Sequence, residues 1–327
     1  MFHRILLLIA GIAAAQTGCA QDAAAPPDGS EPASTPADQS VAYTAAGHGS
    51  VAIESQNIYY HGDFNGPAGK DSGDVRFLVY ELEASYFVAN GWEIHASLPY
   101  IESKFSGSPF AQQFAHPVLS CLTPAGPTPT CRPTLIDNGN YHGTFQDWNA
   151  GVRYHFDYDG VQVAPEVDLV IPSHNYPYYG SASFGERNTK LGVGVELSHQ
   201  FDFTNFFYQA HYEYFFNTPH IGYGNNYNSF GLDVGYFFSP KLSAKFITDL
   251  KIGNGITDQE IGGPPALDPI WLNHDRIRLQ DHGLVGGAID YVFAKNYDLQ
   301  TTLEHAVWGR SNGDLKYDLD LRVTRSF

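Results

Sequence analysis

In several segments, acidic residues stand at every second position and apolar residues stand between them. Within residues 313–327, Asp318 and Asp320 alternate with leucines, and an earlier segment places Glu81 and Glu83 two positions apart. A period of two is typical of a β-strand with one apolar and one polar face. Carboxylates gathered on the polar faces of neighbouring strands attract cations and repel anions. The first chemistry that the sequence indicates is therefore the handling of cations.

The same alternation, applied to the other candidate strands, predicts sixteen acids and six bases on polar faces. In a pore with low-dielectric walls, such an excess of acids favours cations. The alternative is a polar core, in which most acids pair with bases or share protons. The residues that we expect to set ion selectivity are Glu81, Glu83, Glu93, Arg153, Glu166, Asp168, Glu196, Glu213, Asp233, Asp249, Asp290, Glu304, Asp318, Asp320 and Arg322. The other polar-face charges are Asp157, Asp202, Asp298, Lys190, Lys245, Lys251 and Lys316.

Twelve alternating segments are predicted to be the strands that position these charges. Every second connection between them is very short, including Asn90-Gly91 and Asp159-Gly160, which are strong hairpin signals. The other connections are longer, apart from residues 309–313. The predicted strands are 50–62, 74–89, 92–104, 144–158, 160–173, 188–203, 205–217, 227–238, 241–252, 283–294, 296–308 and 314–327.

Short turns that alternate with long loops are typical of outer-membrane barrels. We therefore predict an all-β fold, a transmembrane antiparallel up-and-down β-barrel of about twelve strands. Its short turns face the periplasm, its long loops face outside, and its last strand pairs with its first. Aromatic residues flank both kinds of connection, as expected at the two lipid–water boundaries. The expected location is the outer membrane of a Gram-negative bacterium.

The composition agrees with a strand-rich exported chain. Aromatic residues make up 14% of the 327 residues and charged residues 16%. After the N-terminal segment there is no run of about 18 apolar residues of the kind that forms a transmembrane helix. The formal net charge of −17 disfavours nucleic acid as a partner.

The N-terminal residues are expected to lie outside the barrel. Residues 1–20 resemble a signal peptide, with a lipoprotein-type cut before Cys19 as the alternative, and residues 21–49 form an Ala/Pro/Ser linker predicted to be disordered. The barrel is predicted to occupy residues 50–327. Cys121 and Cys131 lie in one Pro-rich loop and are expected to form a disulfide in an exported protein.

Catalytic and metal-binding patterns are lacking in the sequence. It contains no GxSxG, HExxH or P-loop pattern, and Ser198 and His199 fall on opposite faces of one strand, the wrong geometry for a phospholipase pair. His95 and His155 are interpreted as parts of a polar network in the lumen rather than as metal ligands. We expect neither enzymatic activity nor a cofactor.

Three stretches, "NGWEIHASLPY", "QDWNAGVRYHF" and "APEVDLVIPSHN", resemble an outer-membrane barrel family labelled "MetA-pathway of phenol degradation". The likeness covers about residues 74–327, and Gln146 stands where that family has glycine. It implies uptake of small, often aromatic, compounds. Phe327 likewise resembles the C-terminal aromatic residue by which barrel-assembly machinery recognises its clients. The matching residues are Asn90, Gly91, Pro99, Tyr100, Asp147, Gly151, Arg153, Tyr154, Phe156, Pro172 and Ser173.

The favoured hypothesis is a channel that passes small solutes passively through an acidic, cation-favouring lumen, with the loop 105–143 folded inward to limit solute size. One alternative is an uptake channel for small apolar or aromatic compounds. Another alternative is a closed structural barrel. A phospholipase is the least favoured alternative. Expected partners are outer-membrane lipid, the assembly machinery and a small solute. An apolar binding patch would draw on Phe105, Phe110, Tyr176, Tyr178, Tyr179 and Trp271.

Overall fold

The computed structural model describes residues 45–63, 73–107, 122–123, 126–127, 139–176, 183–257, 274–310 and 313–327. These residues belong to one compact unit, Thr35–Phe327. Cys121 and Cys131 lie outside the described residues, so the disulfide stays a prediction. The same holds for the signal peptide and for most of the linker.

The unit is a closed antiparallel β-barrel of twelve strands, which confirms the predicted fold class. One barrel strand is interrupted twice and consists of β6, β7 and β8. A two-residue pair, β4 (Leu122–Thr123) and β5 (Gly126–Pro127), lies apart from this sheet. The barrel segments are β1 (Gly49–Asp63), β2 (Asp74–Ala89), β3 (Trp92–Ser106), β6 (His142–Phe145), β7 (Trp148–Tyr154), β8 (Phe156–Tyr158), β9 (Val161–Ile171), β10 (Lys190–Gln200), β11 (Phe206–Asn217), β12 (Tyr227–Ser239), β13 (Leu242–Gly253), β14 (Asp281–Ala294), β15 (Tyr297–Arg310) and β16 (Gly313–Ser326).

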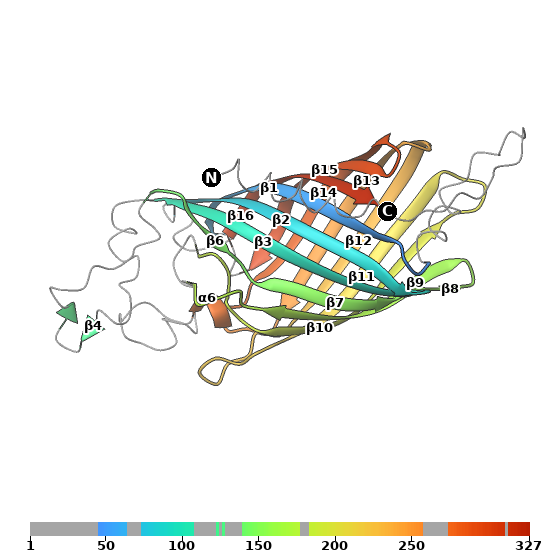
Figure 1. Cartoon of the computed structure of the whole chain (residues 1–327). Coiled ribbons are helices and arrows are strands. Elements are labelled where there is room, and N and C mark those ends of the chain that lie inside the picture. The colour runs from blue at the N-terminus through green and yellow to red at the C-terminus, as the bar shows by residue number, and fades with distance from the viewer. Residues whose placement is uncertain are drawn as a thin grey trace, which may run out of the picture. The chain divides into compact units, whose positions relative to one another are not determined.

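The first and last strands close the barrel. β16 pairs antiparallel with β1 from Ser50↔Ser326 to Asp63↔Gly313, and Gly49 and Phe327 exchange two backbone hydrogen bonds. In Figure 1 the blue β1 accordingly lies beside the red end of the chain. The predicted pairing of the last strand with the first is confirmed, while recognition of Phe327 by assembly machinery stays a prediction.

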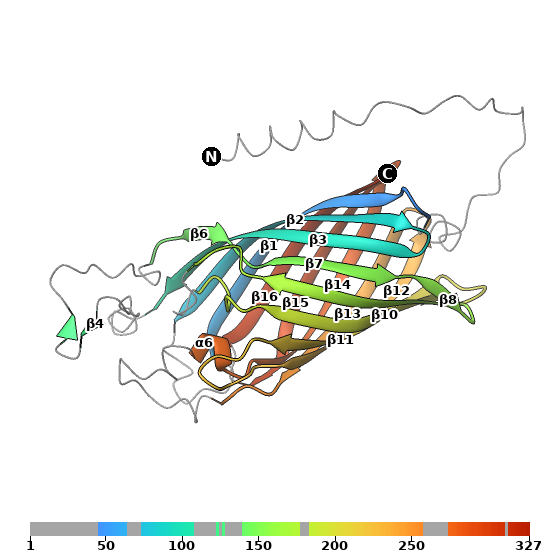
Figure 2. The ribbon, with the colours of Figure 1, turned by 60° about the horizontal axis from the view of Figure 1, so that its bottom comes forward.

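The two ends of the barrel differ in the length of their connections. At the short-turn end, Gly91 and Gly160 take φ values of 77° and 80°, which glycine adopts without strain. The opposite, long-loop end carries the four-residue helix α6 (His274–Ile277), seen in Figure 2. Within the described residues, no helix has the length and apolar character needed to cross a membrane.

The outer wall of the barrel is apolar. Leu319, Leu321 and Val323 of β16 are exposed, and so are the alternate residues Leu232 and Val234 of β12. In a water-soluble protein such a surface would be unusual, whereas in a barrel it matches the hydrocarbon of the bilayer. Exposed aromatic rings flank this belt, and they include Trp92, Tyr158, Phe206, Phe238, Trp148, Phe216 and Trp308.

A bulge interrupts the strand that pairs with β3. Between the pairs Tyr100↔Phe145 and Ser97↔Asn149, three residues of one strand oppose two of the other. The two opposed residues include Pro99, which has no backbone N–H to donate to the ladder. The carbonyl of Pro99 still accepts a hydrogen bond from the backbone N–H of Gln146, at 2.9 Å.

Two predictions about which face a charge occupies are wrong. Lys316 was expected in the lumen, but the ladder between β1 and β16 shifts register after Tyr59, and Leu315 takes the buried position instead. Lys316 is exposed and pairs with Asp314 at 2.6 Å. Asp202 lies in the turn after β10, because this strand ends at Gln200. Local alternation predicts neither a register shift nor the exact end of a strand.

Candidate functional site

A cavity of about 830 Å³ occupies the interior of the barrel. Among the described residues, its wall carries twelve carboxylates but only two arginines, together with two histidines. Thirteen of the fifteen residues predicted to set selectivity line it. Asp290 instead lines a smaller cavity of about 250 Å³ with Lys245, and Asp318 adjoins Glu304 and Asp320. The lining acids are Glu54, Glu81, Glu83, Glu93, Glu166, Asp168, Glu196, Glu213, Asp233, Asp249, Glu304 and Asp320.

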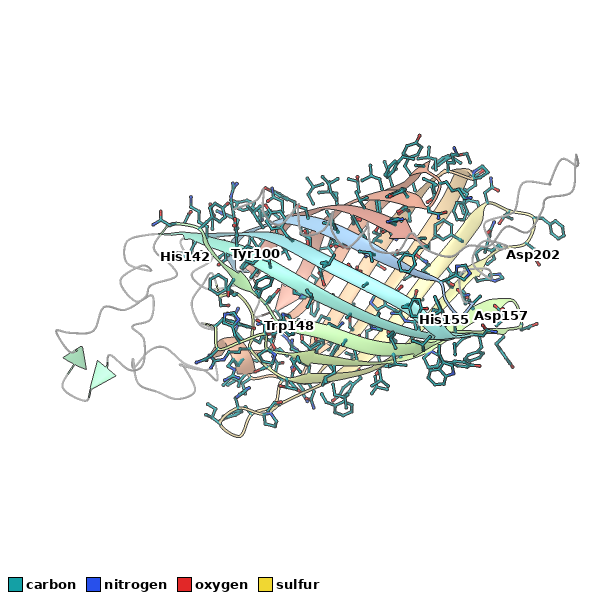
Figure 3. All side chains as sticks on the ribbon, viewed as in Figure 1. Tyr100, His142, Trp148, His155, Asp157 and Asp202 are labelled. Atoms are coloured by element: carbon teal, nitrogen blue, oxygen red, sulfur yellow. The ribbon has the colours of Figure 1, made fainter. Side chains whose placement is uncertain are left out.

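Arg153 of β7 is the centre of one charge network on the wall. It donates from Nε and Nη2 to Glu166 Oε2, at 2.9 and 2.7 Å. Its Nη1 lies 3.7 Å from Glu93 and 3.4 Å from Glu196. His155 donates from Nε2 to the same Glu93 at 2.6 Å, so one guanidinium and one imidazole connect four neighbouring barrel strands. Figure 3 shows His155 toward the short-turn end, with Asp157 beyond it.

Arg322 of β16 is the centre of a second network across the seam between the first and last strands. Its Nη2 donates to Glu83 of β2, and its Nη1 lies 3.6 Å from Glu54 of β1. Glu54 is buried and was missing from the predicted selectivity residues. Its position among alternating apolar residues at 51 and 53 was a usable signal, because inward and outward side chains alternate along a strand.

Several carboxylates on the wall make no ion pair with any described residue. Carboxylate oxygens of Glu304, Asp318 and Asp320 all lie within 4.8 Å of one another, and one oxygen of each is buried without a hydrogen-bond partner. Like charges at this spacing repel strongly in a low dielectric, and protons or mobile cations relieve the repulsion. Two further acids are better matched, since Asp233 pairs with Lys245 at 2.8 Å and Asp168 accepts from His95.

Glycines on the inner face make room for this crowding. Gly151 lies between His95 of β3 and Asp168 of β9 in the ladder, and the 2.8 Å bond from His95 Nε2 to Asp168 Oδ1 passes over it. A Cβ at this glycine would lie 2.4 Å from both bonded atoms. Gly192 similarly lies beneath the carboxylate of Glu213.

Toward the long-loop end, the inner face changes from acidic to apolar. On the inner face of β2, Val79 lies nearer the long-loop end than Glu81 and Glu83. It is buried against Ile101 of β3. Tyr176 and Phe184, from the connection between β9 and β10, pack on this pair and are almost fully buried. The described parts of this connection therefore fold into the end of the barrel. Inward folding was predicted for the loop 105–143, most of which lies outside the described residues.

Polar contacts fasten this inward-folded connection. The backbone N–H of Arg187 donates to the hydroxyl of Tyr176 at 2.9 Å, and that hydroxyl donates to Asp147 in the bulge. Arg276 of α6 donates to the carbonyls of Glu186 and Arg187, at 3.0 and 2.8 Å. A segment of the β13–β14 connection thus holds the β9–β10 connection in place.

Asn188 links this arrangement to a third connection. It is 1% exposed, and its Oδ1 accepts from Arg276 Nε at 3.0 Å and from His220 Nε2. Burial lowers the pKa of His220, and the nearby Arg276 and Arg187 lower it further. Burial would raise the pKa of Glu186, but Lys190 and Lys251 hold it below its ordinary value.

Only part of the predicted aromatic patch lies within the described residues. Phe105 and Tyr176 are buried in the protein interior and offer no open surface at the mouth. Phe110, Tyr178, Tyr179 and Trp271 lie outside the described residues. The signal for an apolar inner layer was present in β2, where residues 75, 77 and 79 are apolar on the face that later carries acids.

No family model and no curated protein matches the sequence. A crystal structure of an outer membrane channel from Pseudomonas putida F1 is similar, with a TM-score of 0.61 and 13% identity, covering 86% of this chain and 96% of that chain. This chain is an outer-membrane β-barrel. Two further structures are less similar. The β domain of the Bordetella autotransporter BrkA has a TM-score of 0.48 and 12% identity, covering 86% of this chain and 99% of that chain. The NanC porin has a TM-score of 0.44 and 12% identity, covering 84% of this chain and 98% of that chain.

At these identities the likeness establishes the fold of this outer-membrane barrel and nothing finer. The resemblance to the phenol-degradation family stays a prediction, because no family model matches. The chemistry of the barrel must be inferred from the residues that line its interior.

Proposed function

We propose that this barrel is a passive channel whose acidic lumen favours small cations. The observation that carries the proposal is the composition of the described wall, with twelve carboxylates and two arginines around a cavity of about 830 Å³. In a low-dielectric wall, unmatched carboxylates raise the local concentration of cations and exclude anions. The fold, shared with a solved outer membrane channel, supports passage through the barrel.

The carboxylates with the strongest influence on permeant ions are those that no base neutralises. Glu81, Glu213, Glu304 and Asp320 line the cavity and form no ion pair with a described residue. Acids that pair with Arg153 or Arg322 contribute less, because the guanidinium groups cancel part of their field.

The reversal potential of the folded protein in a planar bilayer under a KCl gradient tests this proposal. We expect a clear preference for potassium over chloride. A variant with Glu81→Gln, Glu213→Gln, Glu304→Gln and Asp320→Asn is expected to lose most of it. The matched control neutralises Asp157, Asp159 and Asp202, which are exposed at the short-turn end, and is expected to keep the preference. An anion preference, or no conductance from folded protein, would refute the proposal.

Uptake of small apolar or aromatic compounds is a second candidate function. The observation that favours it is the apolar layer of Val79, Ile101, Tyr176 and Phe184 inside the long-loop end. An aromatic solute that competes with these side chains would displace the β9–β10 connection. Concentration-dependent changes in single-channel current on adding phenol, absent with a sugar of similar size, would support it.

A further inference from the structure

The inner face of the barrel changes the sign of its charge along two strands. On β13, Asp249 lines the acidic cavity, and Lys251 follows it on the same face, about 7 Å nearer the long-loop end. On β10, Glu196 lines the cavity and Lys190 is the first residue of the strand at the long-loop end. Both lysines therefore lie beyond the acidic zone in the same direction.

A single aromatic ring holds the two ammonium groups near each other. Lys251 Nζ lies 4.3 Å from the ring centroid of Tyr227 on β12, and Lys190 Nζ lies 5.4 Å from the same centroid. These distances are within the range of cation–π attraction, which offsets part of the repulsion between the two charges. The lysines and the ring form a small cationic group, which we call the collar.

The collar keeps a net positive charge. Lys190 Nζ pairs with Glu186 at 3.1 Å, whereas Lys251 makes no hydrogen bond or ion pair with a described residue.

We propose that Lys190 and Lys251 form a cationic collar that makes conduction through the acidic lumen asymmetric and limits its preference for cations. This inference rests on the proposed channel function. Where a positive zone adjoins a negative zone along a pore, one voltage polarity accumulates mobile ions at the junction and the other depletes them. Currents at equal and opposite voltages are then unequal.

Single-channel recording in symmetric KCl tests the collar, because one inserted molecule has one orientation. We expect unequal currents at opposite voltages in the unmodified protein, and a loss of this asymmetry with a stronger potassium preference in Lys251→Gln. The matched control is Lys245→Gln, on the same face of the same strand but paired with Asp233 in the acidic zone. This control is expected to keep the asymmetry.

A measurement without any variant covers the case in which Lys251→Gln does not fold. Raising the salt from 0.1 M to 1 M shortens the Debye length from about 10 Å to about 3 Å, so the asymmetry should shrink. Equal currents in the unmodified protein, or an asymmetry that survives both high salt and Lys251→Gln, would overturn the collar. A cation-selective but symmetric channel would leave the proposed function intact, whereas an asymmetric channel that prefers anions would overturn the proposed function alone.

Discussion

The hydroxyl of Tyr176 donates a hydrogen bond to a carboxylate oxygen of Asp147, joining the β9–β10 connection to the bulge opposite Pro99. The bulge directs the side chain of Asp147 toward Tyr176, because an extra residue in one strand changes the direction of the neighbouring side chains. Burial raises the pKa of Tyr176, and the bond to Asp147 raises it further, so the hydroxyl keeps its proton at neutral pH. A defect in the strand ladder and an inward-folded loop thus form one structural unit.

Replacing this tyrosine should loosen the long-loop end of the barrel. Tyr176→Phe leaves Asp147 without its donor, at a cost of about 1–3 kcal/mol to the inward-folded arrangement. We therefore expect more frequent or larger open-channel currents in a bilayer. Tyr212→Phe is the matched control, because Tyr212 lies on the outer wall and donates to Asn228 at 3.1 Å. Identical currents in Tyr176→Phe and the unmodified protein would show that this connection does not limit conduction.

The Arg153 network should matter more for stability than the Arg322 network. Arg153→Gln leaves Glu93, Glu166 and Glu196 without their shared cation, and breaking such a buried pair costs about 3–5 kcal/mol. The side chain of Arg322 is 35% exposed against 24% for Arg153, so water screens its partners better. Denaturant unfolding in detergent measures the stability of Arg153→Gln and Arg322→Gln. The control is Lys316→Gln, at an exposed lysine. An equal loss of unfolding free energy in all three variants would contradict the ranking.

Adding one methyl group at Gly151 should break the hydrogen bond between His95 and Asp168 that passes over it, which we call the bridge. The new Cβ of Gly151→Ala would lie 2.4 Å from His95 Nε2 and Asp168 Oδ1, so the bonded pair must separate. We expect a lower unfolding midpoint and a shifted imidazole NMR signal of His95. Gly224→Ala meets nothing within 4 Å and should leave both unchanged. A Gly151→Ala barrel as stable as the original would mean that the bridge contributes little.

Acidification should weaken the contact between the β11–β12 connection and Asn188. The pKa of His220 is lowered in the fold, so its contribution to stability is present above the unfolded value of about 6.5 and is lost as the pH falls toward the folded value. Hydrogen-exchange protection of residues 218–223 should therefore decrease between pH 7.5 and pH 5.5. His220→Gln should remove this pH dependence. Protection that is independent of pH in the unmodified protein would contradict the assignment.

The sequence by itself determined the barrel and the strand faces on which its acids lie. Alternation is a local property, so the strands and the inward position of acids such as Asp249 and Glu304 could be predicted from neighbours two residues away. The short turns likewise depend on local backbone preferences, as at Asn90-Gly91. Glu54 was missing from the predicted residues although the apolar residues at 51 and 53 alternate with it.

The tertiary structure alone decided which bases pair with those acids and which side chains fill the long-loop end of the barrel. Arg153 meets acids from three other strands, and this grouping depends on pairing register rather than on sequence spacing. A register shift removed Lys316 from the lumen, and contacts between distant residues brought Tyr176 and Phe184 against Val79. These arrangements depend on contacts between residues far apart in the chain, and no local pattern encodes such contacts.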